Sequence, residues 1–170
     1  MAKFYCEEYQ RNKRMKRYYF AYGMNTNIKE MTQRCPQAIN LGHCTLKGFE
    51  LKFRYHADID EVAGSVMEGV LWDITPDCER ALDGLEGYPF YYDKIEVVVT
   101  PTYPIDNTTH FIAMAYIMTN KCQEEIPSVQ YEQCLIEGYR ANGLNVDKLT
   151  TKIESLIIKQ CTKQTASVGF

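Results

Sequence analysis

The chain reads YYFAYG over residues 18–23, and this aromatic run decides how the sequence around it folds. Five apolar or aromatic residues that end abruptly at a glycine predict a buried strand running into a loop. Two asparagines follow, Asn25 and Asn27, and either can cap a helix over residues 28–34. Pro36 ends that helix, because the residue before a proline avoids the helical conformation.

The rest of the chain alternates between strand and helix signals. Residues 41–54 predict one bent strand or two short ones, and residues 55–63 are polar and acidic and predict a loop. Further strands are predicted at 66–74, 91–100 and 111–119, the last two as an antiparallel pair. Gly69 lies inside the first of these and indicates a bulge or a close backbone approach.

Three more helices are predicted from capping residues and apolar stripes. Thr75-Pro76 begins one and Gly87 ends it, while Ser128 begins the next. The apolar face of the first is expected to contain Cys78, Ala81, Leu82 and Leu85, that of the second Tyr131, Cys134, Leu135 and Gly138, and that of the last helix Leu149, Ile153, Leu156 and Ile157.

Composition places the chain among ordinary globular proteins. It has 170 residues, 45% apolar and 24% charged, which suits one domain with a proper core. No apolar run reaches the roughly 20 residues that cross a bilayer, and no secretory signal is recognisable, so a cytoplasmic location is expected. The seven cysteines form no CxxC pair and predict reduced thiols. The three histidines and these cysteines lack the spacing of a metal site, so we expect no metal.

Charge is unevenly distributed. The whole chain has a formal net charge of -3, but residues 1–17 are strongly basic. Such an arm can contact nucleic acid or a partner protein, although most arms of this kind are simply solvated. We therefore divide the chain into a basic arm at 1–17, one domain at 18–163 and a tail at 164–170.

The first candidate for chemistry is the loop Tyr22-Gly23-Met24-Asn25. A glycine at a strand end permits positive φ, which lets successive backbone N–H groups turn inward and bind an anion. The helix that follows would add the positive end of its dipole. A carboxylate fits this loop better than a phosphate, because no lysine follows as in a P-loop. Taken alone, the loop is also compatible with a plain structural turn.

The second candidate is Glu86, the last helical residue before Gly87. An acid at the negative end of a helix is unfavourable by up to about 1 kcal/mol, and this raises the carboxyl pKa. A carboxyl with a raised pKa is a candidate general base. On local grounds alone, a solvent-exposed glutamate is the other interpretation.

These features occur with others in one order along the chain. They are Tyr22-Gly23-x-Asn25, Gly69-Val70-Leu71-Trp72, Leu82-Asp83-x-x-Glu86-Gly87, the run from Ala115 to Asn120, Pro127-Ser128-x-x-Tyr131 and Gly138-x-x-x-Asn142-Gly143-Leu144. This ordered set resembles the gamma-glutamylcyclotransferase family, and the resemblance extends from about Tyr19 to the last helix.

The resemblance implies an α+β fold in which a small, mixed, strongly curved β-barrel is flanked by helices. It implies an enzyme of lactam-forming acyltransferase or C–N lyase type, which needs no cofactor. A γ-glutamyl amide is cleaved to 5-oxoproline, and an amine or amino acid is released, as in glutathione metabolism. By matching position, Glu86 is the acid–base residue and Tyr22, Gly23, Met24 and Asn25 bind the substrate. Tyr131 matches the tyrosine that closes the pocket.

Two positions depart from the family pattern, in which the loop usually reads Tyr-Gly-Ser-Asn-Leu. Met24 replaces the serine and Thr26 the leucine, so these residues bear on which γ-glutamyl compound is accepted. A catalytically silent binding protein with the same pocket is the alternative to an enzyme. Nucleic-acid binding through the basic arm has less support, since no base-stacking sheet or zinc module accompanies the charge. The sequence leaves a homodimer open.

Overall fold

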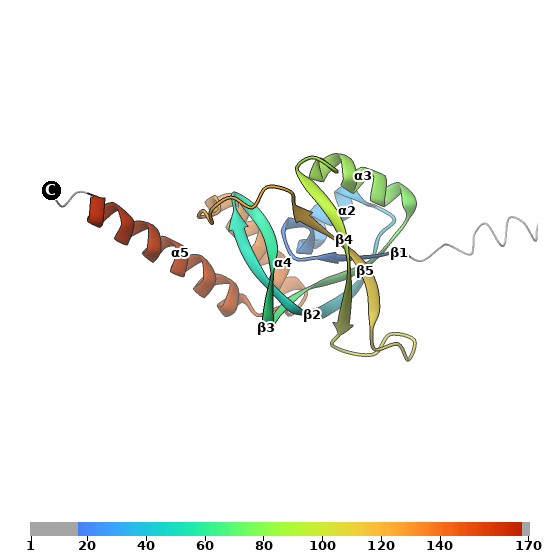
Figure 1. Ribbon diagram of the computed structural model, residues 1–170. Helices are drawn as coiled ribbons and strands as arrows, with labels where there is room; N and C mark the ends of the chain where they lie inside the picture. Colours follow the sequence, from blue (N-terminus) through green and yellow to red (C-terminus); the bar gives the residue numbers. More distant parts are fainter. Residues whose placement is uncertain (1–16, 168–170) are drawn as a thin grey trace, which may run out of the picture.

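The structure is a computed structural model that describes the backbone of residues 17–167 and the side chains of residues 17–163. Five strands form a closed barrel in the order β1-β3-β2-β4-β5 (Figure 1). Their bounds are β1 Arg17–Ala21, β2 Ile39–Arg54, β3 His56–Ile74, β4 Tyr92–Pro101 and β5 Phe111–Met118. All neighbouring strands are antiparallel except β1 and β5, which pair in parallel at Tyr19 and Met114. The barrel is therefore mixed, and the predicted fold class is confirmed.

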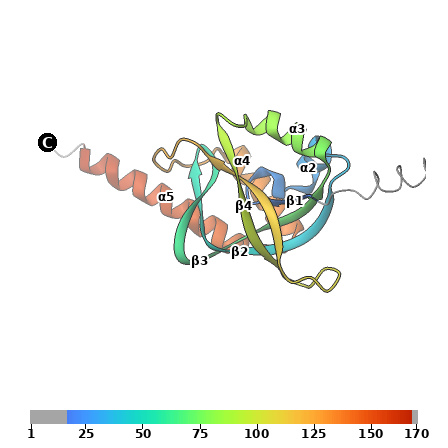
Figure 2. The ribbon, with the colours of Figure 1, turned by 45° about the vertical axis from the view of Figure 1, so that its right-hand side comes forward.

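The helices lie outside the barrel. They are the short 3₁₀ helix η1 (Met24–Thr26), α2 (Ile28–Arg34), α3 (Pro76–Glu86), α4 (Val129–Ala141) and α5 (Val146–Ser167). Figures 1 and 2 show α3 over one end of the barrel, the β4–β5 loop at the opposite end, and α5 extending away to one side. The predicted caps are confirmed: Asn27 caps α2, Thr75 caps α3 and Ser128 caps α4.

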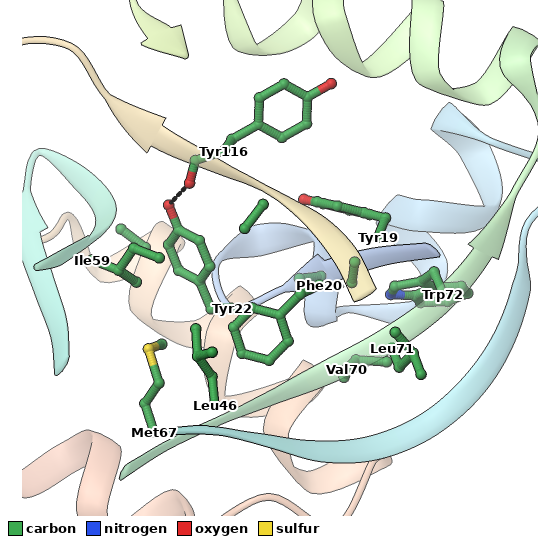
Figure 3. Packing of buried hydrophobic residues seen from close by; sticks show 14 of the residues in the cluster. Tyr19, Phe20, Tyr22, Leu46, Ile59, Met67, Val70, Leu71, Trp72 and Tyr116 are labelled. Carbon is green, nitrogen blue, oxygen red and sulfur yellow. Dashed lines mark hydrogen bonds between the residues drawn. The ribbon is translucent and has the colours of Figure 1, made fainter. Parts of the chain in front are cut away.

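The aromatic run at 18–22 lies at the centre of the core (Figure 3). Phe20 is fully buried, and Tyr19 and Tyr22 are almost so. The predicted close approach at Gly69 is real, because a Cβ there would stand 2.5 Å from the Ala21 carbonyl oxygen and from the Phe20 ring. Glycine at this position lets β3 lie directly against β1, which continues into the loop at residue 22.

The loop predicted at residues 55–63 is wrong. Strand β3 begins at His56 and continues the hairpin from β2, which is a single strand with register shifts at Asn40/Gly42 and Lys47/Phe49. Two of the acidic residues that suggested a loop form ion pairs instead: Arg54 contacts Asp58 at 2.5 Å and Asp60 at 2.6 Å. The Asp58 carboxylate is fully buried and also accepts the Met118 N–H at 2.9 Å. Buried and paired charges do not mark a loop, because their partners replace water.

The predicted helix faces need small corrections. Cys78 and Leu82 of α3 are buried as expected, but Ala81 and Leu85 are exposed. In α5, Leu149, Ile153 and Leu156 are buried, whereas Ile157 is exposed. The buried apolar stripes of α3 and α5 are thus narrower than predicted.

The described residues cover only part of the expected division of the chain. The basic arm up to residue 16 lies outside the described residues, and β1 begins at Arg17. Helix α5 continues to Ser167, four residues into the expected tail. Among the described helices, none combines the length and apolarity needed to span a bilayer. Within residues 17–167, no three His, Cys, Asp or Glu side chains are grouped so that they could hold a metal ion.

Candidate active site

A cavity of about 170 Å³ lies where the loop after β1, the end of α3 and the start of β3 meet. Its walls are mostly phenol rings, contributed by Tyr19, Tyr22, Tyr91, Tyr92, Tyr116 and Tyr131. All six residues predicted for the site line this one cavity: Tyr22, Gly23, Met24, Asn25, Glu86 and Tyr131. Among the described residues of the lining, Glu86 is the one carboxyl.

Gly23 is required for a different reason than expected. Its φ is −103°, outside the left-handed region, so the predicted positive φ is wrong. A Cβ at this position would instead lie 3.1 Å from both Ala57 Cβ and Tyr131 Oη. The Thr26 N–H binds the Gly23 carbonyl at 2.9 Å, so this N–H is used within η1 and not for an anion. Glycine therefore makes room where three segments of the chain meet.

The side chain of Asn25 is the polar centre of the cavity. Its Oδ1 accepts a hydrogen bond of 2.5 Å from Arg34, and its Nδ2 donates to Glu86 Oε1 at 3.0 Å and to Tyr19 Oη at 2.9 Å. A guanidinium has donors only, so Arg34 must face the amide oxygen. This fixes the amide orientation, and the NH₂ group then faces Glu86.

Asn25 is also held through its backbone. The Trp72 indole N–H donates to the Asn25 carbonyl oxygen at 3.1 Å. On the other side, Asn142 Nδ2 donates to the Thr26 carbonyl oxygen at 2.8 Å, and Asn27 Nδ2 donates to the Cys134 carbonyl oxygen at 3.1 Å. The mid-chain segment ending in Trp72 and the helix α4 therefore hold the loop from two directions.

Glu86 is the last residue of α3, and Gly87 ends the helix with a left-handed φ of 65°. Burial raises the pKa of the Glu86 carboxyl above its ordinary value, and the Arg34 charge and the Asn25 hydrogen bond oppose part of this rise. The carboxyl is thus close to a cation yet harder to ionise than a surface glutamate. Both properties suit a group that takes up and returns a proton.

Two predicted tyrosines differ in what their hydroxyls do. Tyr22 Oη donates a hydrogen bond of 2.5 Å to the Tyr116 carbonyl oxygen on β5, so this hydroxyl is committed to the barrel (Figure 3). Tyr131 Oη accepts the Ala57 N–H at 3.0 Å and retains its own proton to donate. Burial raises the pKa of Tyr131, so the phenol is neutral at ordinary pH.

The sequence interpretation missed Arg34 and His56, among other residues of the lining. Arg34 lies in the last turn of α2, where a cation is usually explained by the helix dipole. Its guanidinium also contacts Met24 Sδ and Glu30 at 2.9 Å each, so the methionine that replaces the family's serine lies against this charge. The tyrosines of β4 and β5 gave no signal, because alternate residues of any strand face a barrel interior.

Comparison with known proteins agrees with this fold. The sequence profile of the AIG2-like family matches residues 66–149. A solved structure described as a gamma-glutamyl cyclotransferase superposes with a TM-score of 0.71 at 26% identity, covering 83% of this chain and 88% of that one. An uncharacterised human protein gives a TM-score of 0.70 at 27% identity, with the same coverage of 83% and 88%.

YkqA from Bacillus subtilis shares the fold, with a TM-score of 0.72 at 24% identity over 85% of this chain and 56% of that one. No curated protein matches the sequence significantly. The barrel, the profile match of the AIG2-like family and the two structures above 25% identity show that this chain has a cyclotransferase-like fold and is similar to gamma-glutamyl cyclotransferase.

Proposed function

We propose that this protein is a gamma-glutamyl cyclotransferase that converts a γ-glutamyl amide to 5-oxoproline and a free amine or amino acid. The observation that carries the proposal is the half-buried Glu86 carboxyl in a small cavity, with a raised pKa and a hydrogen bond from Asn25. A site intended only to hold an anionic ligand gains nothing from such a carboxyl. A site that must move a proton requires one.

The reaction makes modest demands on the protein. The α-amine nitrogen of the substrate attacks its own γ-carbonyl carbon, a C–N bond closes the five-membered ring, and the amide C–N bond breaks. Because nucleophile and carbonyl belong to one molecule, correct folding of the substrate contributes roughly 7–11 kcal/mol in ideal geometry. The protein has to hold that folded shape, accept protons from the attacking nitrogen and supply one to the leaving nitrogen.

In this proposal Glu86 acts first as a general base and then as a general acid. The substrate amine is an ammonium at neutral pH, so the ionised carboxylate first removes a proton from it. The carboxyl releases this first proton to water. When the attacking nitrogen bonds to the γ-carbon it becomes positively charged, and the carboxylate takes its second proton and gives it to the departing nitrogen. Glu86 is then ionised again, and the released amine takes up a further proton from water. A pKa raised by burial brings the carboxyl closer to the working pH, which favours both steps.

Two further groups complete the site in this proposal. Arg34 lines the cavity and brings positive charge for the substrate's α-carboxylate. Tyr131 is kept neutral by burial and faces the same space, so its hydroxyl donates to the oxygen that becomes negative during attack. Because Gly23 has no side chain, space remains beside the Tyr131 hydroxyl for the folded substrate.

The test is a screen of γ-glutamyl amino acids and γ-glutamylamines with the purified protein, in which 5-oxoproline is detected by mass spectrometry. We expect 5-oxoproline and the matching amine in equal amounts from at least one compound. If a compound binds tightly by calorimetry and none is converted, the protein is a binding module and the proposal is wrong.

A further inference from the structure

The cavity that holds Glu86 has a buried floor and an exposed mouth. Of its lining residues, Tyr19, Asn25, Tyr92 and Tyr131 are buried, whereas Leu85 is 52% exposed and Tyr91 47% exposed. A residue that lines a cavity and is also open to solvent lies at the opening. His56 is exposed as well, so Leu85, Tyr91 and His56 form what we call the mouth residues.

The volume of the cavity limits which part of a substrate it encloses. About 170 Å³ is less than the roughly 300 Å³ at which ordinary ligand pockets begin. The polar groups Glu86 and Arg34 are both hydrogen-bonded to the buried Asn25, and the reacting γ-glutamyl group must lie against these three residues. The group attached to the γ-nitrogen therefore projects past the mouth residues.

The rings at the mouth pack against one another at steep angles. The His56 ring lies 5.4 Å from the Tyr131 ring and 6.1 Å from the Tyr91 ring, measured between centroids. Tyr91 in turn packs edge-to-face on Tyr92 at 5.2 Å, and its hydroxyl lies 3.2 Å from His56 Nδ1. Each ring is thus held by a neighbour, and Leu85 adds an aliphatic side chain beside Glu86.

We propose that the mouth residues Leu85, Tyr91 and His56 form a binding site for an aromatic ring carried by the leaving group of the substrate. The proposal rests on the proposed function and deepens it by naming the substrate class: γ-glutamyl amides of aromatic amines or aromatic amino acids. An aromatic ring gains both from apolar contact and from edge-to-face or stacked geometry, and half-exposed rings are available for both. A small leaving group such as ethylamine or alanine does not reach these rings.

The experiment uses two matched pairs of substrates that differ only by a phenyl ring. These are γ-glutamyl-phenethylamine with γ-glutamyl-ethylamine, and γ-glutamyl-phenylalanine with γ-glutamyl-alanine. We expect kcat/KM for 5-oxoproline formation to be about tenfold higher with the ring in each pair, which corresponds to the upper range of one aromatic contact. The second pair repeats the comparison with leaving groups that carry a carboxylate of their own.

Variants of the mouth then assign the preference. In Tyr91→Ala, the ratio of kcat/KM within each pair should fall to near one, whereas Tyr91→Phe, which keeps the ring, should retain the ratio. Tyr103→Ala is the matched control, since Tyr103 is 80% exposed and lies in the β4–β5 loop at the far end of the barrel (Figure 1). A ratio between two substrates is independent of the fraction of folded enzyme, so partial misfolding cannot imitate the result.

The outcomes separate the two proposals. Equal kcat/KM within both pairs overturns the aromatic site, while the 5-oxoproline formed still supports the cyclotransferase. A preference that survives Tyr91→Ala overturns the assignment to the mouth. The absence of 5-oxoproline from all four compounds and from the wider screen overturns the proposed function itself.

Discussion

The amide nitrogen of Asn25 lies 3.0 Å from Glu86 Oε1 and joins the loop after β1 to the C-terminal end of α3. The two residues are 61 positions apart in the sequence. Arg34 binds the other side of the same amide and thereby determines which atom faces the carboxyl. The orientation of Glu86 thus depends on Asn25 in η1 and Arg34 in α2, and both residues lower the pKa that burial raises.

Replacing Arg34 by methionine should move the pH dependence of the reaction. The Arg34 charge lowers the pKa of Glu86 against the effect of burial, so its removal raises that pKa further. Because the carboxylate is the base that starts the reaction, the acidic limb of kcat/KM should shift to higher pH. Arg34→Lys keeps the charge but loses the planar guanidinium. The acidic limb of its kcat/KM profile should therefore stay closer to the wild-type pH than that of Arg34→Met.

The measurement is a kcat/KM profile from pH 4 to pH 9 for both variants and the wild type. An acidic limb that stays in place in Arg34→Met would contradict the coupling, even if the overall rate fell. A lower rate alone would be explained by weaker binding of the substrate's carboxylate.

Glu86→Gln should stabilise the fold at neutral pH. A carboxyl whose pKa is raised on folding favours the native state while it is protonated and opposes it once ionised. The contribution is therefore lost as pH rises from the ordinary carboxyl pKa through the folded one. Glutamine carries no charge and can still accept the Asn25 hydrogen bond, so its Tm should exceed that of the wild type at pH 7 and approach it near pH 4. A lower Tm at pH 7 would show that the charged form is well accommodated.

Two alanine substitutions distinguish the roles of glycine in the structure. Gly69→Ala places a Cβ 2.5 Å from the Ala21 carbonyl oxygen, and β1 cannot yield without disturbing the core. We expect a loss of about 3 kcal/mol in the free energy of unfolding, the upper range for overpacking. Gly84→Ala is the control, because no atom lies within 4 Å of its added Cβ and the site is inside α3. It should gain up to about 1 kcal/mol in urea denaturation. Similar values for both would contradict the close approach.

Local sequence motifs predicted the secondary structure better than the pattern of charges did. Strong local signals were reliable: the aromatic run at 18–22, the Thr75-Pro76 helix start and the Gly87 stop all match the structure. Charge in the hairpin was misleading, because Asp58 and Asp60 pair with Arg54 across the hairpin and with Lys121 from a distant segment. A single sequence does not reveal such pairings before the fold brings them together.

The residues of the candidate site were also predicted only in part. The ordered motifs indicated Glu86, the loop at 22–25 and Tyr131, and these residues line one cavity. Arg34 was missed because its contact to Asn25 depends on α2 folding back beside the loop. The Gly23 interpretation selected the right residue for the wrong reason, since its neighbours Ala57 and Tyr131 come from β3 and α4.

The most direct test of the whole account is 5-oxoproline formation by Glu86→Gln compared with wild type, on the best substrate found. Loss of a general acid–base group typically costs 10²- to 10⁴-fold, so kcat/KM should fall roughly a thousandfold while substrate still binds. Calorimetric titration on the same preparation reports whether the cavity is intact. A Glu86→Gln variant that forms 5-oxoproline at the wild-type rate would contradict the central role of this carboxyl.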